Sequence, residues 1–152
     1  MKLATVSIRG GSPEIVAVGD NGRIVRLGAA HPKVPSTMIE LIGAWDVLRD
    51  EVRQAVAQST EVVDLDGNVR FLAPIARPGK IMAMGLNYAD HVAEAGIEVP
   101  KHQVWFCKQP NTVHPPYEPI QIPKASAAID YEVELVFVIG KRGRHIPKGE
   151  AP

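Results

Sequence analysis

Short apolar runs separated by turn residues make up the first third of the chain. Residues 3–8 and 14–19 are rich in β-branched and small apolar residues, a pattern that predicts two strands. Asp20-Asn21-Gly22 follows the second run. Because Asn-Gly supplies the positive φ angles of a type I′ turn, this tripeptide predicts a hairpin leading into a third strand over residues 23–27.

Two helices are predicted after these strands. Ser36 is a suitable N-cap for a short helix through Ile42, and Asp46 begins a second helix that runs to about Gln58. The second helix carries one apolar stripe, formed by Leu48, Val52, Ala55 and Val56. This face is expected to pack on the sheet.

A second hairpin signal, Asp66-Gly67-Asn68, lies between strands predicted over residues 62–65 and 69–72. The sequence APIARPGK follows at residues 73–80, with two prolines and a glycine. Such a segment is typical of a domain boundary. We therefore expect a small N-terminal α/β domain over residues 1–73 and a second domain over residues 74–152.

The second domain opens with a strand predicted over residues 80–84, followed by GLNYADHVAEAG. Asn87 is a plausible N-cap and Gly96 suits the position after the helix, so a helix is expected over residues 88–95. A helix this short is marginal without tertiary support, so it is expected to order or shift when a ligand binds. Further strands are predicted over residues 104–107, 120–122 and 130–139.

The last of these runs, IDYEVELVFVIG, places two glutamates inside an apolar strand. Side chains alternate along a strand, so Glu132 and Glu134 share one face, about 6.7 Å apart. Two carboxylates that converge to about 5 Å repel by roughly 3 kcal/mol at an effective dielectric constant near 20. Three explanations are open: the face meets water, a basic residue pairs with the acids, or both acids bind a cation.

Three other residues are candidates for chemistry. His91 and Glu94 are spaced i, i+3 on the short helix, where a carboxylate can orient an imidazole that takes a proton from water. The same spacing is also typical of an ordinary ion pair on a solvated helix face. Lys108, at the end of VWFCK, could bind an anionic substrate group or stand as an exposed lysine at a strand end.

Composition narrows the class of protein. The 152 residues are 45% hydrophobic and 22% charged, with 17 basic and 17 acidic residues, so the net charge is zero. This balance argues against a nucleic-acid partner or a polybasic membrane patch, and no apolar run is long enough to span a membrane. The single cysteine, Cys107, is expected in the core and fits a reducing compartment, with the cytoplasm as the expected location. The other histidines lack zinc-site spacing and are expected at the surface: His31, His102, His114 and His145.

The order of these motifs resembles the fumarylacetoacetate hydrolase family. The resemblance rests on RPGKIMAMGLNYADHVAE, FCKQPNTV, EPIQIP and DYEVELVFVIGKRGRHIP, in that order, and is most specific between Pro78 and Ile146. It implies an α+β fold in which the small N-terminal domain precedes the first part of a mixed β-roll catalytic domain.

The resemblance also implies roles for the candidate residues. Glu132 and Glu134 match a Glu-x-Glu pair that binds Mg²⁺ or Mn²⁺, with Ca²⁺ as an alternative. His91 and Glu94 match a dyad that activates water, and Lys108 matches a lysine beside the metal. The implied reaction is metal-dependent hydrolysis of a C–C bond in a small acidic 2-oxo or 1,3-dicarbonyl compound, in aromatic catabolism. Isomerisation or decarboxylation of related diacids is the alternative.

Members of the family carry an aspartate as a third metal ligand after the long strand, whereas this sequence stops at Pro152. We therefore expect the chain to be the front half of an enzyme and to be inactive alone, unless a second copy or another chain completes the site. Family members are usually dimers, so a homodimer is one expectation. A non-catalytic fragment or association module is the remaining alternative.

Overall fold

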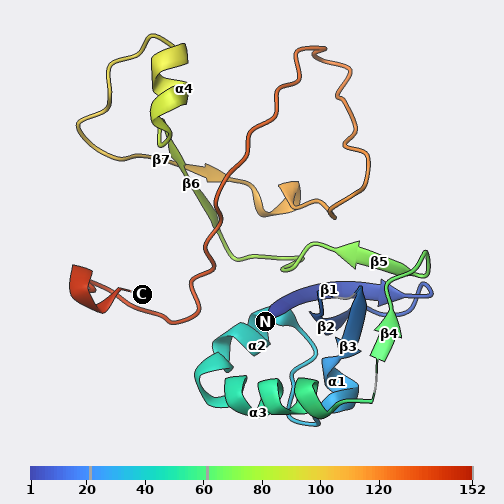
Figure 1. Ribbon diagram of the computed structural model, residues 1–152. Helices are drawn as coiled ribbons and strands as arrows, with labels where there is room; N and C mark the ends of the chain where they lie inside the picture. Colours follow the sequence, from blue (N-terminus) through green and yellow to red (C-terminus); the bar gives the residue numbers. More distant parts are fainter. Residues whose placement is uncertain (21, 61, 152) are drawn as a thin grey trace.

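The computed structural model describes residues 1–20, 22–60 and 62–151 (Figure 1). Its elements are β1 (Lys2–Ile8), β2 (Glu14–Val18), β3 (Arg23–Arg26), α1 (Leu27–Ala30), α2 (Met38–Gly43), α3 (Trp45–Gln58), β4 (Val62–Asp64), β5 (Val69–Leu72), β6 (Ile81–Gly85), α4 (Ala89–Glu94), β7 (Val104–Lys108) and the 3₁₀ turns η1 (Pro110–Thr112) and η2 (Lys148–Glu150). The mixed α and β character expected from the sequence is confirmed. The β-roll layout of the second domain stays a prediction. None of the helices in the described ranges is long and apolar enough to cross a membrane.

The N-terminal unit is built on a five-stranded antiparallel sheet with the order β4-β3-β2-β1-β5. Its central strand, β2, has buried side chains on both faces: Ile15 and Ala17 on one, Val16 on the other. Asn21, in the turn predicted between β2 and β3, lies outside the described residues. The two strands nevertheless pair antiparallel, with Val18 opposite Ile24, as a hairpin requires.

The helices α2 and α3 cover one face of this sheet. The fully buried Leu41 and Val52 pack with Ile15 and Leu27 in one cluster, and the predicted stripe of α3 faces the sheet. The N-cap of α2 is Thr37 rather than Ser36. The Thr37 side chain accepts from Glu40 N and the Glu40 carboxylate accepts from Thr37 N, which forms a capping box.

The opposite face of the sheet carries a second apolar cluster. Val6, Val16 and Ile24 are fully buried there, under partly buried side chains that include Val63, Leu65, Val69 and Phe71. The predicted hairpin between β4 and β5 is wrong, because β4 pairs with β3 and β5 pairs with β1. The Asp66 turn does form, since Asn68 N donates to Asp66 Oδ1 at 2.8 Å. The turn connects the two edge strands of a curled sheet. Side chains of β4 and β5 cover the cluster of Val6, Val16 and Ile24, and the two strands do not pair with each other.

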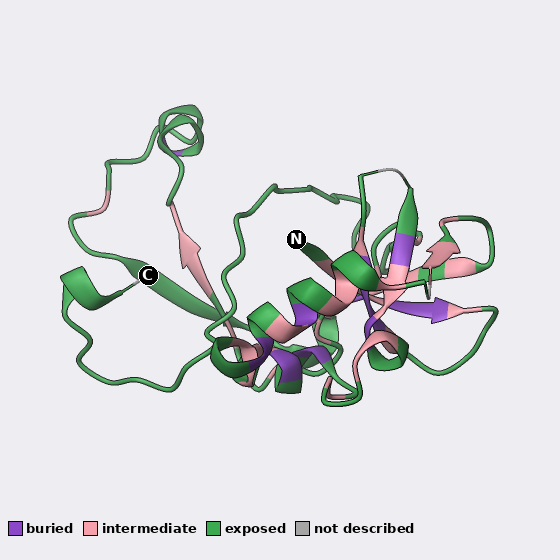
Figure 2. Cartoon of the chain, turned by 60° about the horizontal axis from the view of Figure 1, so that its bottom comes forward, coloured by how far each residue is buried: buried purple, intermediate pink, exposed green. Residues whose placement is uncertain are grey.

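The second half of the chain is much less packed. Strands β6 and β7 pair antiparallel as a separate two-stranded sheet, and α4 lies in the connection between them. Among the described residues, every buried hydrophobic side chain except Val92 lies within residues 6–73. Figure 2 shows this contrast between the two halves.

Two predicted strands do not form. Residues 120–122 and 130–139 make no ladder with any described strand, and all of them are exposed. Val133 is 84% exposed and Phe137 78% exposed. A strand needs a neighbour that completes its backbone hydrogen bonds and side chains that cover its apolar faces. The described part of this chain supplies neither, so the apolar run stays extended without a sheet.

The segment between the two halves packs on the N-terminal unit. Thr5 Oγ1 donates to Pro74 O at 2.8 Å. Ile75 contacts the cluster between the sheet and the helices, called the helix-side cluster, which includes Leu41 and Val52. The chain then leaves this unit and enters β6 at Ile81. The boundary between residues 73 and 74 stays a prediction.

Candidate functional site

The short helix α4 has a defined C-terminal end. Gly96 has a φ of +63°, its N–H donates to Ala93 O at 3.1 Å, and Ile97 N donates to Val92 O at 3.3 Å. These two bonds form a Schellman motif, in which a glycine adopts the left-handed conformation after a helix. The helix predicted over residues 88–95 is thus confirmed to within one residue at each end, and Gly96 takes its predicted position.

The predicted acid–base pair lies on this helix. His91 and Glu94 are both exposed, whereas Val92 is 4% exposed and holds the helix in place. No ion pair joins His91 to Glu94 in the described part of the chain. Their i, i+3 spacing keeps both on one helix face. Both side chains are therefore open to a ligand.

The acidic segment reaches the beginning of the same helix. Asn87 Nδ2 donates to Glu134 Oε2 at 3.3 Å, and Leu135 N donates to Tyr88 Oη at 3.3 Å. Asn87 does not cap the helix as predicted. Tyr88 is the N-cap instead, with no side-chain hydrogen bond to the helix among the described residues, and the Asn87 amide is directed to the Glu134 carboxylate. Sequence analysis missed the contacts of Asn87 and Tyr88, since no local pattern indicates a partner 47 residues away.

The two glutamates are not on a shielded sheet face. Glu132 and Glu134 are both exposed, and the apolar strand predicted to carry them does not form. Both carboxylates face water in this structure, and Glu134 additionally accepts a hydrogen bond from the Asn87 amide. No group of three or more His, Cys, Asp or Glu residues that could hold a metal ion occurs within the described ranges. Carboxylate oxygens suit a hard cation, but two of them leave most of its coordination positions to other ligands.

The predicted substrate lysine lies at the other end of the β6–β7 ladder. Lys108 pairs with Ile81, whereas Val104 pairs with Gly85, just before α4. At about 3.4 Å per residue, four residues of strand separate Lys108 from the α4 end by about 14 Å. Lys108 Nζ lies 5.4 Å from the centroid of the Phe106 ring. The structure therefore brings Glu134 to α4 and places Lys108 apart from it.

Cys107 is exposed rather than in the core as predicted. Its thiol lies 3.3 Å from Met82 Sδ across the two-stranded ladder. The prediction failed because a small apolar side chain on a strand becomes buried only when another layer covers that face. The described residues provide no such layer over β7, whose five residues are all exposed.

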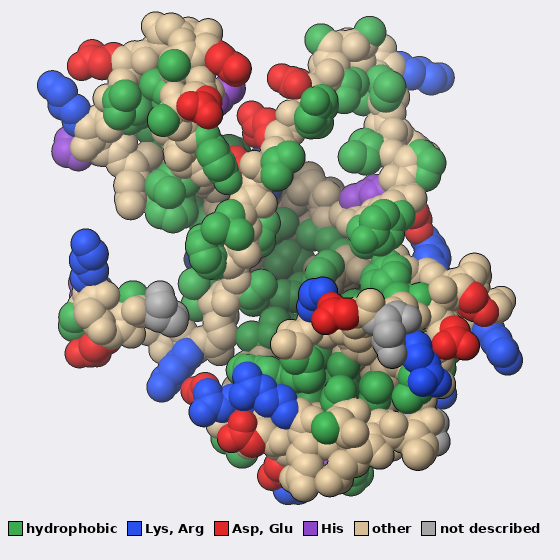
Figure 3. Space-filling view, viewed as in Figure 1, with side chains coloured by type: hydrophobic (Ala, Val, Ile, Leu, Met, Phe, Trp, Pro, Cys, Tyr) green, Lys and Arg blue, Asp and Glu red, His purple; other side chains and the backbone are tan. Residues whose placement is uncertain are grey.

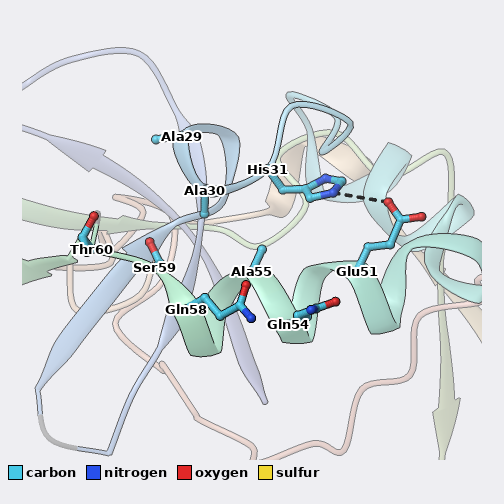
Figure 4. A pocket seen from close by; sticks show the side chains of 9 residues that line it. All are labelled: Ala29, Ala30, His31, Glu51, Gln54, Ala55, Gln58, Ser59 and Thr60. Atoms are coloured by element: carbon cyan, nitrogen blue, oxygen red, sulfur yellow. Dashed lines mark ion pairs between the residues drawn. The ribbon is translucent and has the colours of Figure 1, made fainter.

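A second cluster of polar groups lies in the N-terminal unit (Figure 4). His31, expected at the surface, is only 20% exposed, and its Nε2 lies 3.2 Å from Glu51 Oε2. Lys33 Nζ also contacts Glu51 Oε2, at 3.0 Å, while His31 Nδ1 is buried and has no hydrogen-bond partner among the described residues. These groups border a surface cleft of about 490 Å³ between α1 and α3, lined by Ala29, Ala30, His31, Glu51, Gln54, Ala55, Gln58, Ser59 and Thr60. Nothing in the local sequence distinguishes His31 from the exposed histidines.

Comparison with known proteins places these residues in context. The family model described as "Fumarylacetoacetate (FAA) hydrolase C-terminal" matches residues 80–152. The mitochondrial oxaloacetate tautomerase FAHD2A of Bos taurus is 39% identical over 133 residues, covering 88% of this chain and 42% of that protein. The corresponding protein of Homo sapiens is 36% identical over 133 residues, with the same coverage of 88% and 42%.

A solved structure is also similar. The crystal structure assigned to an HpcE protein of Mycobacterium smegmatis has a TM-score of 0.61 and 26% sequence identity, covering 79% of this chain and 40% of that one. The chain thus spans about two fifths of the length of the relatives that it matches.

Proposed function

The chain belongs to the fumarylacetoacetate hydrolase family, and from this premise we propose that it carries the acid–base residues of an enzyme that interconverts the keto and enol forms of a small acidic 2-oxo acid. The observation that carries the proposal is the 39% identity, over 133 residues, to a relative named as an oxaloacetate tautomerase. The open His91 and Glu94 on α4 supply the chemistry that such a reaction needs.

Keto–enol interconversion moves one proton between carbon and oxygen. His91 takes a proton from the carbon beside the keto group, so that a C–H bond breaks and its electrons form the enolate. A proton returned to the enolate oxygen completes the enol, so no atom is gained or lost. Glu94, one helical turn from His91, orients the imidazole and stabilises its protonated form.

The acidic segment supplies the remaining groups. Glu132 and Glu134 would hold a divalent cation such as Mg²⁺ or Mn²⁺, and the Asn87 amide keeps the Glu134 carboxylate beside the start of α4. When bound, such a cation stabilises negative charge on the substrate oxygen. Lys108 would bind a carboxylate of the diacid, which requires β7 to approach α4 more closely than it does in this structure.

Hydrolysis of a C–C bond, the reaction expected from the sequence, is the second candidate. The name of the matching family favours it. In that reaction the same imidazole removes a proton from water, and the hydroxyl group adds to a carbonyl carbon. The C–C bond then breaks, its electrons leave as an enolate, and the protonated imidazole returns the proton to the carbon of that enolate. Both candidates use the same residues, so product analysis distinguishes them.

The isolated chain is expected to be inactive, because its two glutamates lack a third carboxylate among the described residues and its apolar segment is uncovered. A cytoplasmic location and a homodimer stay predictions.

A chimera tests the proposal. These 152 residues would replace the matching segment of the Bos taurus tautomerase, and enol-to-keto conversion of oxaloacetate would be followed by absorbance with Mg²⁺ present. We expect tautomerase activity that falls about 100-fold in His91→Gln and is unchanged in His102→Gln, an exposed histidine on the loop after α4. A folded chimera without activity, or a His91→Gln chimera that matches its parent, would contradict the proposal.

A further inference from the structure

We propose that Arg70 and Phe71 of β5 form a docking site for the proline-rich segment 109–119, and that this contact sets the position of the end of β7 that carries Lys108. Segment 109–119 is called the strap below. The docking contact stands on the structure alone, whereas its importance for substrate binding rests on the role proposed for Lys108.

Two adjacent residues of β5 contact two adjacent residues of the strap. Arg70 Nε donates to Glu118 Oε1, and the Phe71 and Tyr117 rings meet edge to face, with centroids 5.8 Å apart and an interplanar angle of 79°. Because neighbouring side chains on a strand point to opposite faces, Arg70 and Phe71 lie on opposite sides of β5. The strap therefore contacts this strand through one ion pair and one ring contact.

Strand β5, which the strap contacts, is at the edge of the sheet. β5 pairs with β1 on one side, and no described strand pairs with its other side. Exposed edges of this kind are commonly protected by charged side chains, and Glu118 of the strap pairs with the Arg70 guanidinium on this strand. Tyr117 has a φ of +65°, a conformation that residues with side chains rarely adopt unless surrounding contacts hold it. Tyr117 makes its ring contact with Phe71 from this conformation.

The strap is stiff, so its contact with β5 restricts where the end of β7 can lie. It contains four prolines, Pro110, Pro115, Pro116 and Pro119, and each ring fixes one φ angle. Its first turn, η1, is closed by Thr112, whose Oγ1 and N both donate to Gln109 O, at 2.7 and 3.0 Å. Gln109 directly follows Lys108. One end of the strap is thus fixed by the β6–β7 ladder and the other by β5.

The pKa of Glu118 supports a specific contact between Glu118 and Arg70. The hydrogen bond from Arg70 holds the pKa of Glu118 below its usual value, with a smaller contribution from His114 on the strap. Since the carboxylate is the form that Arg70 binds, docking is complete above the ordinary glutamate pKa. It weakens as pH falls through the lowered value.

The single cysteine offers a direct test. A nitroxide label on the exposed Cys107 sits next to Lys108, and its broadening of the β5 amide NMR signals reports how close β7 lies to the N-terminal unit. In the wild-type chain we expect a defined broadening pattern at neutral pH that fades at acid pH. The broadening should be lost in Arg70→Gln and in Glu118→Gln, and part of it should remain in Arg70→Lys. The double change of Arg70→Glu with Glu118→Arg swaps the two charges and should restore the broadening.

Arg49→Gln is the matched control, since Arg49 is an exposed arginine on α3. The Glu118 change lies outside the sheet, so loss of broadening there is separable from unfolding, which the signals of β1 to β4 report. In the chimera, Arg70→Gln should raise KM for oxaloacetate severalfold while kcat changes less.

Unchanged broadening in both Arg70→Gln and Glu118→Gln would overturn the docking contact and leave the proposed function untouched. Loss of docking in Arg70→Gln with an unchanged KM would overturn the link to Lys108 alone. An active His91→Gln chimera with intact docking would instead overturn the proposed function.

Discussion

Asn87 Nδ2 lies 3.3 Å from Glu134 Oε2, which joins the start of helix α4 to the acidic segment 47 residues later in the chain. Tyr88 reinforces the connection by accepting a hydrogen bond from Leu135 N. The connection holds although the segment forms no strand, so it does not depend on a completed sheet. It is the one described contact that brings a predicted metal ligand to the helix of the predicted acid–base pair.

The first prediction concerns this contact. Asn87→Ala should release the Glu134 carboxylate from α4 while changing the free energy of unfolding by less than about 0.5 kcal/mol, because both side chains are exposed. Added Mn²⁺ should broaden the NMR signals of Glu134 and of the start of α4 together in the wild-type chain. In Asn87→Ala the α4 signals should stay sharp. Asn111→Ala, at an exposed asparagine in η1, is the control, and equal broadening of α4 in both variants would count against the contact.

The second prediction concerns the N-cap of α2. Thr37→Ala removes the side chain that accepts from Glu40 N, so it should lower the free energy of unfolding by about 1 kcal/mol. Ser36→Ala, one residue earlier, should change it by less than about 0.5 kcal/mol. Urea unfolding followed by circular dichroism measures both. A larger loss in Ser36→Ala than in Thr37→Ala would place the cap where the sequence alone predicted it.

The third prediction concerns the helix-side core. Val52 is fully buried on α3, so Val52→Ala should cost about 2 kcal/mol through lost burial and an unfilled cavity. Val47 lies on the same helix and is 77% exposed, which makes Val47→Ala the matched control with an expected change below about 0.5 kcal/mol. Equal losses of stability in the two variants would contradict the orientation of α3.

The fourth prediction is a pH dependence at the turn between β4 and β5. The pKa of Asp66 is lowered first by the hydrogen bond from the Asn68 backbone N–H and then by the Asn68 side chain. A lowered folded-state pKa gives stability that is present above the ordinary aspartate pKa and is lost as pH falls through the lowered value. Asn68→Ala removes only the second cause, so a ¹³C NMR titration should find the Asp66 pKa still below its ordinary value. A return to the ordinary value would show that the backbone bond contributes nothing.

Local sequence predicted several elements well because the determinants of those elements are themselves local. The apolar stripe of α3 and the glycine after α4 each act within a few residues, and both positions are confirmed. The shift of the α2 cap from Ser36 to Thr37 has the same origin. Both residues can cap a helix, and only Thr37 has a glutamate three residues later.

The errors arise where distant residues decide the outcome. The Asp66 turn forms as predicted, yet β4 and β5 pair with other strands because burial around Ile24 curls the sheet. His31 is largely buried by its contact with Glu51, which lies 20 residues away in the sequence. The apolar run at residues 130–139 has the composition of a buried strand, but composition does not supply the neighbouring strands that bury it.

The last prediction follows from that apolar run. Residues 135–139 read LVFVI, without a charge or a proline, and Phe137 and Ile139 are 78% and 84% exposed. Hydrophobic side chains also line the hollow at the centre of the face in Figure 3. An uncovered run of high β-propensity pairs readily with another copy of itself. The isolated chain should therefore self-associate as its concentration rises, as measured by sedimentation velocity.

Phe137→Lys should reduce this association without loss of stability, because Phe137 is not part of either core cluster. Val99→Lys, which changes an apolar residue that is 70% exposed outside this run, should leave the association in place. If both changes reduced it equally, general surface hydrophobicity rather than strand pairing would be the cause.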